Sequence, residues 1–422
     1  MIFSKSLSSC PLSWMQRLAF VLSFGILGFQ MLPGGARLPS LLLGLIGIWA
    51  VKTKHLDLDH PPVRRITWLL LGLAFLVAAS AVSSFDQKSS WIYSIGIACF
   101  CLVAYGILYG LKPPGALHWL DRGLQWLFAF LLCDAIVQFS LGVDLFGVPY
   151  DPSFEEGRLL GPFKDNLHLS LFLAILAPIS LWHWSRAHPW LGLAVFTLTG
   201  WIVMLSGARS ALVLLALGGV PLFWRLDRRH KFLFLASLMA SLAAAYTTNT
   251  LVQKKVSQTI TPLVQLSSES PEIWFTTLDS MLTYRLTIWE TAGRMVLDRP
   301  FFGVGAKAFG TAYPHYSHRP EDPFRDPSTP VYHAHNMYVA ITAEMGLVGL
   351  AGFLTGIGVM IRWYHRASSA GRRAAQPYAA ALGALAFPFQ SQPVLLTVWW
   401  FPVVLLLVCA YLRALDIGEK PA

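Results

Sequence analysis

Residues 333–361 read HAHNMYVAITAEMGLVGLAGFLTGIGVMI, a polar cluster that runs directly into an apolar segment. The apolar part begins near Asn336 and is long enough to cross a bilayer as a helix, since about 20 residues suffice. The polar part ends at His335. An imidazole changes charge near neutral pH and is costly to bury in a membrane. We therefore expect His335 to lie at a membrane surface, as a candidate acid or base.

Apolar residues also dominate much of the rest of the chain. Hydrophobic residues make up 55% of the 422 residues and charged residues only 13%, about half the charged share of a soluble domain. Apolar runs recur along most of the chain and predict an all-α integral membrane protein of about twelve transmembrane helices. The predicted spans are 18–33, 37–51, 66–82, 91–110, 119–141, 167–184, 190–206, 210–224, 231–247, 336–361, 376–391 and 394–412.

The basic residues orient this bundle. With an even number of spans both termini share one compartment, and most of the 32 Lys and Arg residues fall on that side. The positive-inside rule then places both termini in the cytoplasm. The net charge of +10 is accounted for mainly by this asymmetry. We expect no nucleic-acid binding, because the chain has no soluble domain that could carry a basic patch.

The spans divide the chain into three parts. Residues 1–247 hold nine predicted spans with short loops, residues 248–335 form one large periplasmic loop, and residues 336–422 hold the last three spans and a cytoplasmic tail. Within the large loop, 282–297 has apolar residues at helical spacing and predicts an amphipathic helix that ends at Asp298–Pro300. Residues 311–331 are rich in Pro, Tyr and His, and we expect them to be irregular.

Four cationic residues on the outer face are candidates for binding an anion. Arg209 follows Ser206 and Gly207 in a tight turn between two spans, and Arg285 lies on the amphipathic helix with Trp289 four residues later. Arg158 and Lys164 lie in a Gly/Pro-rich loop. The alternative for each is an ordinary solvated or snorkelling charge. For Arg209, the small polar neighbours favour an anion site.

The histidines have competing interpretations. Asn336 is a suitable helix N-cap, so His335 could be an ordinary polar residue at a helix start, with His333 merely flanking it. Alternatively, His315, His318, His333 and His335 could together bind zinc. Their spacing matches no strong zinc signature, and we expect no metal and no cofactor.

Two acidic features complete the set. Glu344 lies inside the predicted 336–361 span, where an acid needs a partner and is a functional suspect. Asp57 and Asp59 form the one Asp-x-Asp pattern of the chain, which binds a Mg²⁺-nucleotide in many sugar transferases. Both lie on the cytoplasmic side of this topology, where we expect them to solvate a short loop.

Together these motifs resemble the lipopolysaccharide O-antigen ligase family. Its signature is His-Asn or similar, nine residues, Gly, two residues and Gly, and the chain has this spacing from His335 to Gly349. Four further motifs occur in the same order as in the family: Gly161-x-Phe163-x-Asp165-Asn166, Ser206-x-x-Arg209, Arg285-x-x-x-Trp289 and Asp298-Arg299-Pro300-x-x-Gly303-Val304-Gly305. Ala208 replaces a polar residue of the family's turn, and Lys164 and Asp165 depart from its Gly-x-Phe loop.

The resemblance implies a metal-independent enzyme with the type C glycosyltransferase fold. Such an enzyme moves a glycan from undecaprenyl pyrophosphate to the lipid A–core oligosaccharide at the periplasmic face of the bacterial inner membrane. By position, His335, Arg209 and Arg285 are the implied active-site residues. The expected partners are the lipid-linked glycan, the lipid A–core acceptor and membrane lipids.

Elementary chemistry is consistent with this assignment. A departing pyrophosphate needs cations rather than a general acid, and arginine keeps its charge. An attacking sugar hydroxyl needs a base, which a neutral imidazole can provide near neutral pH. A glycan polymerase and a protein O-oligosaccharyltransferase of the same superfamily remain alternatives. A transporter is a more distant one, because few charged residues lie inside the spans.

Overall fold

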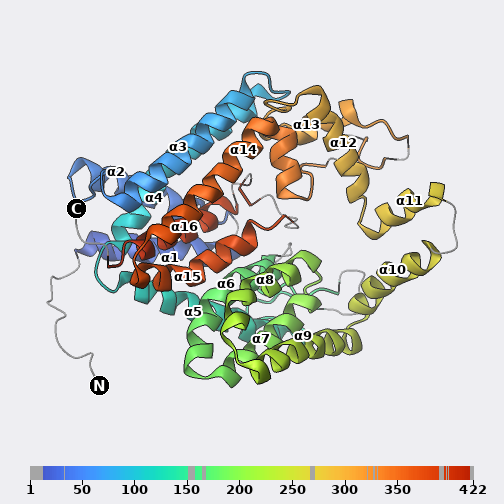
Figure 1. The fold of residues 1–422 in the computed structure, drawn as a ribbon, viewed down its shortest axis with the longest axis horizontal. Coiled ribbons are helices and arrows are strands. Elements are labelled where there is room, and N and C mark those ends of the chain that lie inside the picture. The colour runs from blue at the N-terminus through green and yellow to red at the C-terminus, as the bar shows by residue number, and fades with distance from the viewer. Residues whose placement is uncertain are drawn as a thin grey trace.

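The structure, a computed structural model, is built almost entirely of α-helices (Figure 1). It describes residues 13–32, 34–150, 157–163, 168–266, 271–320, 322–326, 328–329, 331–388, 394–395, 397 and 399–418. Among these residues the β-pairing is limited to one isolated bridge between Val143 and Pro149. The expectation of an all-α fold is confirmed.

A helix forms at each predicted span, with ends that differ by several residues. These helices are α1 (Trp14–Gly28), α2 (Arg37–Lys52), α3 (Pro61–Ala81), α4 (Gln87–Leu111), α5 (Ala116–Leu141), α6 (His168–Ala187), α7 (Pro189–Leu205), α8 (Arg209–Arg225), α9 (Arg228–Thr248), α14 (Met337–Arg366), α15 (Ser369–Leu385) and α16 (Phe401–Leu415).

The lengths of these helices fit an integral membrane protein. Within the described residues, 6 helices are long and apolar enough to cross a membrane, namely α3, α4, α5, α6, α9 and α14. The shorter apolar helices α7, α8 and α16 have 10–17 residues. The 376–391 span differs most from its prediction, because its helix starts at Ser369 and ends at Leu385. Residues 389–391 of that span lie outside the described residues.

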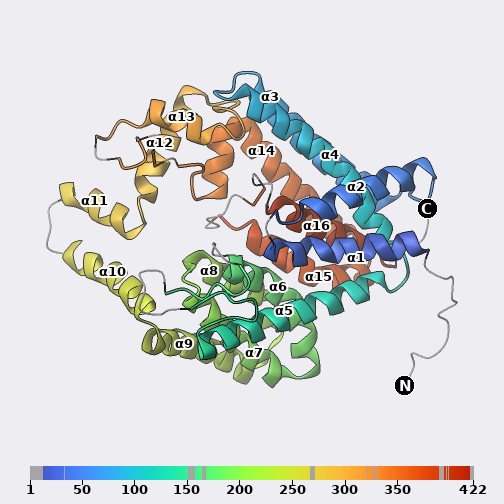
Figure 2. The same ribbon diagram turned by 180° about the vertical axis from the view of Figure 1, so that it is seen from behind.

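The helices form two groups joined by α15 and α16. Helices α1 to α4 pack together with α14 against α3, while α6 to α9 form the second group. Helix α15 contacts α6 and α8 on one side and α16 on the other, and α16 reaches α3 and α4 (Figures 1 and 2). Of the six long apolar helices, α6 is the most enclosed, with 83% of its apolar segment buried.

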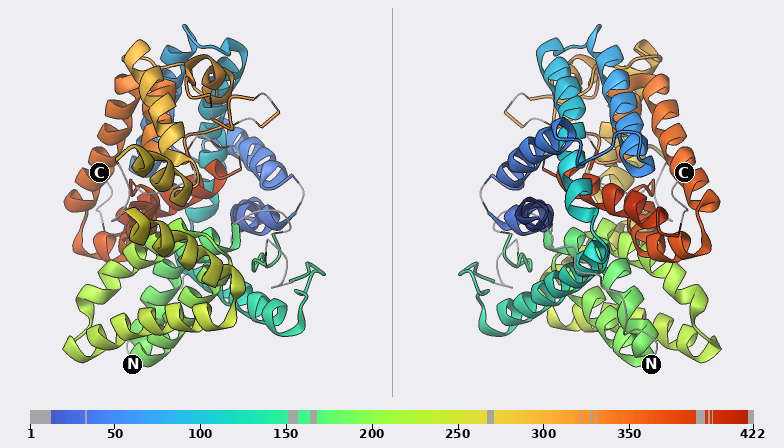
Figure 3. Two further views of the ribbon diagram at one scale, coloured as in Figure 1. Left: turned by 90° about the vertical axis from the view of Figure 1, so that its right-hand side faces the viewer. Right: turned by 90° about the vertical axis from the view of Figure 1, so that its left-hand side faces the viewer.

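The loop between α9 and α14 has more regular structure than predicted. It contains α10 (Thr250–Leu266), α11 (Pro271–Met281), α12 (Arg285–Asp298) and α13 (Phe309–Tyr316). The predicted 282–297 helix was placed three residues early, since Thr283 and Tyr284 have positive φ and cannot continue a helix. The expectation that 311–331 is irregular was wrong for its start, where α13 accommodates Pro314. Helices α10 and α11 lie at one edge of the molecule in Figures 1 and 2, and in the left view of Figure 3 that edge faces the viewer.

A break in α14 fastens this loop to the bundle. At Gly346, φ is +68° and the helix loses its regular path. The carbonyls of Ala343 and Glu344 instead accept the N–H groups of Val304 and Gly305, both at 2.9 Å. The N–H groups of 347 and 348 in turn donate to the carbonyls of 300 and 301 at 2.8 and 3.2 Å, so four backbone groups at the break have partners in the 300–305 segment.

Glycine is required at the break for two reasons. The left-handed backbone at Gly346 is strained for other residues. A Cβ at Gly346 would also lie 2.2 Å from the carbonyl oxygen of Phe301, and one at Gly303 would lie 2.4 Å from that of Ala343. The spacing from His335 to Gly346 is thus the distance from the start of α14 to the point where the 300–305 segment crosses it.

Candidate active site

The start of α14 presents His335. Asn336 caps the helix, with its Oδ1 accepting the N–H groups of Tyr338 and Val339 at 3.0 and 3.2 Å. Its Nδ2 donates to the carbonyl of Pro388 at 2.7 Å, which ties the cap to the chain beyond α15. His335 is half-buried and has a φ of +49°. The cap and this rare backbone conformation together fix the backbone position from which the His335 side chain extends.

His333 and His335 form a close pair. Their ring centroids are 4.2 Å apart, and the backbone N–H of His335 donates to Nδ1 of His333 at 3.1 Å. Burial first, and then the positive charge of Arg285, lowers the pKa of His335 to about 4. Burial also lowers the pKa of His333 to about 4, with smaller contributions from His335, Lys307 and Arg285. Both rings are therefore neutral at pH 7, as a general base must be before it acts.

Helix α12 is attached to this segment through Trp289. Its Nε1 donates to the carbonyl of Ala334 at 2.8 Å, between the two histidines. Trp289 and Arg285 are one turn apart, so the bond that holds the indole also fixes the distance between the start of α12 and His335. Trp289, which was predicted as a supporting residue, therefore contacts the histidine segment directly.

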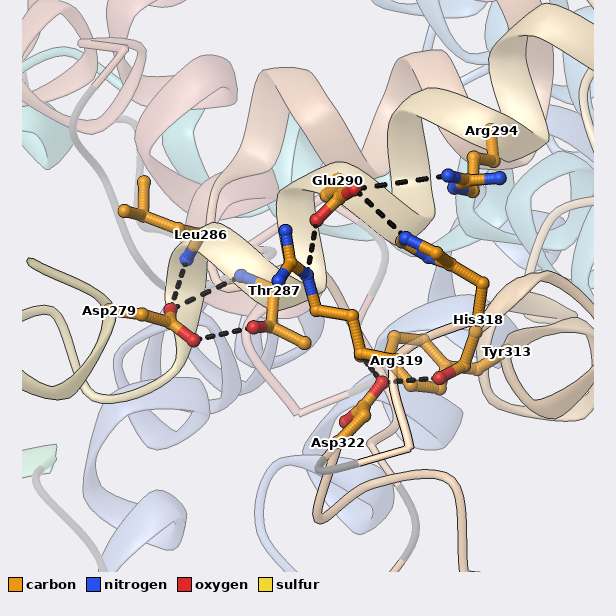
Figure 4. A network of polar contacts seen from close by, with 10 residues as sticks. Asp279, Leu286, Thr287, Glu290, Arg294, Tyr313, His318, Arg319 and Asp322 are labelled. Carbon is orange, nitrogen blue, oxygen red and sulfur yellow. Dashed lines mark hydrogen bonds and ion pairs between the residues drawn. The ribbon is translucent and has the colours of Figure 1, made fainter. Parts of the chain in front are cut away.

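Arg285 is the first residue of α12 and is held from α11. The buried carboxylate of Asp279 accepts the N–H groups of Leu286 and Thr287 at 2.8 and 3.2 Å, and the hydroxyl of Thr287 at 2.5 Å (Figure 4). Desolvation first, and then the charge of Arg209, lowers the pKa of Arg285. The two guanidinium groups are therefore close enough for their charges to repel each other.

Arg209 is the first residue of α8 and reaches the same turn of α11. Its Nη1 donates to the carbonyl of Met281 at 3.4 Å. Arg209 and Arg285 thus both stand at helix N-termini, where the helix dipole disfavours a cation and favours an anion. Two cations that converge at two such termini form a site suited to a group with several negative charges.

Arg158 lies in the neighbouring loop. The N–H of Leu159 donates to the carbonyl of Leu205 at 3.2 Å, directly before the turn that leads to Arg209. The buried Gln138 holds the next residues of this loop through its Oε1. Within the described part of the chain, Nε of Arg158 and Oγ of Ser206 are buried without a hydrogen-bond partner. Lys164 lies outside the described residues.

Several residues with left-handed backbone conformation lie in or next to this site. The non-glycine residues with positive φ in the described ranges are Lys54, Thr283, Tyr284, Lys307 and His335. Four of them belong to the site or lie directly before Arg285. Such conformations cost roughly 1–3 kcal/mol each and tend to cluster at functional sites.

Two residues enter this site that the sequence did not single out for it. Lys307 follows the 303–305 turn, and its charge contributes to the lowered pKa of His333. Asp279 positions the start of α12. No spacing rule links either residue to His335 or Arg285, because the contacts cross between separate helices. Glu344, suspected from its buried position, accepts the N–H of Lys307 at 3.0 Å.

The four histidines considered as zinc ligands do not come together. His318 lies 3.3 Å from Glu290 (Figure 4), and His315 packs against Phe85 and Tyr316. Among the described residues, no group of three or more His, Cys, Asp and Glu side chains is arranged to hold a metal ion.

Comparison with known families supplies the context for this geometry. Residues 193–354 match the family model described as O-antigen ligase. The match covers less than half of the chain and marks an O-antigen ligase domain within it. The O-antigen ligase domain runs from α7 into α14 and contains Arg209, Arg285 and His335, while Arg158 lies before it. Members of this family are glycosyltransferase-like enzymes. No curated protein matches the chain.

An apolar cavity adjoins the O-antigen ligase domain. It has a volume of about 390 Å³ and lies between α14, α15 and α16. Met337, the residue after the Asn336 cap, lines it, as do Tyr364 and His365 near the other end of α14. The cavity therefore extends along α14 from the neighbourhood of His335.

Proposed function

We propose that this protein transfers a glycan from undecaprenyl pyrophosphate to a lipid A–core oligosaccharide, without a metal and with inversion at the anomeric carbon. The observation that carries the proposal is the convergence of Arg209 and Arg285, each at a helix N-terminus, beside the neutral His335. It is a site for a diphosphate next to a base.

The arginines suit the leaving group. As the glycosidic bond breaks, negative charge develops on the pyrophosphate oxygens, and the electron pair of the bond leaves with them. Fixed guanidinium groups in a partly dry site stabilise that charge without having to reorganise. Arg158 and Lys164 are included in the proposal as further phosphate contacts.

His335 suits the attacking group. A sugar hydroxyl of the acceptor loses its proton to the imidazole as it attacks the anomeric carbon opposite the departing phosphate. General base catalysis of this kind contributes about 10²–10⁴-fold. His333 and Asn336 support the ring through the contacts described above.

The cavity along α14 supports a lipid-linked donor. Its lining is almost entirely apolar and starts at Met337, one residue beyond Asn336. A long hydrocarbon chain in this cavity would leave its diphosphate beside His335. The proposed setting is the bacterial inner membrane, with the site on the periplasmic face and both termini in the cytoplasm. There both lipid substrates are confined to one surface, which lowers the entropic cost of their meeting.

The test is a transfer assay with purified protein in lipid nanodiscs. An undecaprenyl-pyrophosphate-linked glycan is offered together with lipid A–core, a Ser/Thr-containing acceptor peptide and a second donor molecule, with and without EDTA. We expect glycan on lipid A–core in both conditions. Elongation of the second donor would indicate a polymerase instead, and modified peptide would indicate a protein transferase. Loss of transfer with EDTA would contradict the metal-independent reaction.

Arginine geometry is tested in the same assay. Arg209→Lys and Arg285→Lys keep a charge but lose the planar fork that binds two phosphate oxygens at once. If two-oxygen contacts are needed, each Lys variant loses transfer as fully as the corresponding Ala variant. Full activity of both Lys variants would show that charge alone suffices.

A further inference from the structure

Lys307 is held in a costly backbone conformation at the edge of the site. Its φ is +68°, a region that side chains other than glycine rarely adopt. It follows Gly305, and the next helix, α13, packs its Gly310 against the carbonyl of Val331, two residues before His333. The segment that carries Lys307 therefore lies alongside the segment that carries the histidines.

Three helices fix the backbone on either side of Lys307. The buried carboxylate of Glu344 in α14 accepts the N–H of Lys307 at 3.0 Å and also bonds the N–H of Phe309. The preceding residue, Ala306, donates to Ser80 of α3 at 3.2 Å and accepts from Ser90 of α4 at 2.6 Å. A buried acid inside a candidate span is thus used to hold the backbone of a lysine.

This amount of fixation is more than the packing of an exposed lysine requires. The side chain of Lys307 is exposed, and its Nζ lies 5.9 Å from the ring centroid of Tyr93. A cation–π contact of that kind forms readily from ordinary backbone. Strain of this type persists where the surroundings enforce it, and it is typical of residues that must meet a ligand.

Two elements approach the histidine segment: α12, which carries Arg285, bonds Ala334 through Trp289, and the segment that carries Lys307 meets Val331 at Gly310. The charge of Arg209 contributes to the lowered pKa of Arg285, and the charge of Arg285 contributes to the lowered pKa of His335 and His333. The charge of Lys307 also contributes to the lowered pKa of His333. Arg285 and Lys307 therefore reach the histidine segment from two different elements. In an inverting displacement the nucleophile and the leaving group occupy opposite sides of the reacting carbon. If the arginines hold the departing diphosphate, Lys307 is a cation on a neighbouring segment that is left for the acceptor.

We propose that Lys307 binds an anionic group of the acceptor, and that Glu344 is the positioning residue that holds Lys307 there. The inference rests on the proposed function, and it adds a recognition element for the second substrate. Phosphate is the anion to test first, because an ammonium group binds it as a point charge. The donor diphosphate is the other possible source of that phosphate, and the experiment separates the two.

The experiment compares Lys307→Met and Lys307→Arg with the wild type in nanodiscs. The acceptor is lipid A–core, either phosphorylated or treated with phosphatase, and KM is measured separately for acceptor and donor. A contact with a charged group is worth a factor of roughly ten or more. We expect Lys307→Met to raise KM for the phosphorylated acceptor about tenfold and to abolish the preference for phosphate. Lys307→Arg should restore most of that preference.

Lys88→Met serves as the matched control, because Lys88 is also exposed but lies at the start of α4. It should leave both KM values unchanged. An unchanged acceptor KM in Lys307→Met, or a rise in the donor KM instead, would overturn the inference.

The role of Glu344 has its own readout. Glu344→Ala should raise the acceptor KM as Lys307→Met does, and the double variant should be no worse than either, because both act through one contact. Glu344→Gln keeps an oxygen that can accept the N–H of Lys307, so it should retain most of the phosphate preference and folds if the Ala variant does not. Additive effects would contradict the positioning role.

A binding measurement separates this inference from the proposed reaction. Phosphorylated and phosphatase-treated lipid A–core are bound without donor to wild type and to Lys307→Met, and Kd is measured. A phosphate preference that Lys307→Met removes supports the inference even if no glycan is transferred, a result that would count against the proposed reaction alone. Equal preference in both proteins would refute the inference whether or not the enzyme transfers glycan.

Discussion

Asp279 offers the sharpest test of how the two arginines are arranged. It lies in the last turns of α11, and its carboxylate accepts three hydrogen bonds from the residues directly after Arg285. Two residues further on, the carbonyl of Met281 accepts Arg209. Asp279→Ala should therefore release the start of α12 and disturb the diphosphate site without removing either guanidinium group.

The size of the effect follows from these contacts. Replacing a helix-capping side chain with Ala costs about 0.5–2 kcal/mol, and hydrogen bonds to a charged acceptor lie at the upper end of such values. We take about 2 kcal/mol, which corresponds to roughly thirty-fold in kcat/KM. Asp279→Asn keeps an oxygen for the two backbone N–H groups and should cost only about three-fold, at the low end of the capping range.

The assay measures kcat and KM for the lipid-linked donor in nanodiscs. Asp322 provides a matched control in the same loop (Figure 4). It is as buried as Asp279, at 6% and 5% exposed, and it also accepts three hydrogen bonds, from Tyr313, Ser317 and Phe324. Asp322→Ala should lower thermal stability to a similar extent, with a smaller effect on the donor KM.

A double-variant cycle completes the test. Because Asp279 acts through Arg285, the double variant with Arg285→Ala should lose no more donor affinity than Arg285→Ala alone. Equal losses of donor affinity in Asp279→Ala and Asp322→Ala would mean that the loop fold matters and the position of Arg285 does not. That result would refute the proposed role of Asp279 in positioning Arg285.

Three further predictions concern the histidine, the cavity and the indole. The acid limb of the pH–rate profile should lie near pH 4, because burial lowers the pKa of His335 to about 4 and its base form is lost only below that pH. Arg285→Gln should move this limb to higher pH. A wild-type limb near pH 6.5 would contradict the prediction. Gly383→Leu, in the cavity wall, should raise the donor KM several-fold. Gly358→Leu should not, although an added Cβ meets no atom within 4 Å at either glycine. Equal KM values in the two variants would exclude the lipid chain from this cavity. Trp289→Phe removes one hydrogen bond of about 1 kcal/mol and should lower kcat roughly five-fold with unchanged protein abundance. Full activity of this variant would show that the bond does not position the histidine segment.

The sequence predicted the helices of the bundle well for a simple physical reason. A helix that crosses a bilayer must be apolar over its whole length, so its signal is strong even in one sequence. Residues 336–361 were predicted as a span from hydropathy alone, and α14 covers all of them except its N-cap, Asn336. The 376–391 span was less accurate because its helix is rich in Ala and Gly and carries Pro377, so apolar character does not mark its ends.

The loop was predicted less completely. Helix α12 was recognised from its apolar spacing, but its start was misjudged, because nothing in the sequence marks Thr283 and Tyr284 as left-handed. Helix α13 was missed because Pro314 lies inside it, and proline usually ends a helix. Helix α10 was not predicted, although the end of α9 was placed within one residue, at 247.

The candidate site divides in the same way. His335, Arg209 and Arg285 were identified because each belongs to a local motif with a definite spacing. Asp279 and Lys307 were missed because their contacts join segments that are distant in the sequence, and neither residue type is unusual in a polar loop. Such pairs become visible only when the break at Gly346 and the turn of α11 bring the segments together.

The central claim is that His335 acts as a neutral base beside a diphosphate held by arginines. The most direct measurement is glycan transfer by purified His335→Ala in nanodiscs, made together with the Kd of the undecaprenyl-pyrophosphate-linked donor. We expect transfer to be lost while the donor Kd stays within about two-fold of the wild type, because the arginine contacts remain. Transfer at a rate close to that of the wild type would contradict it.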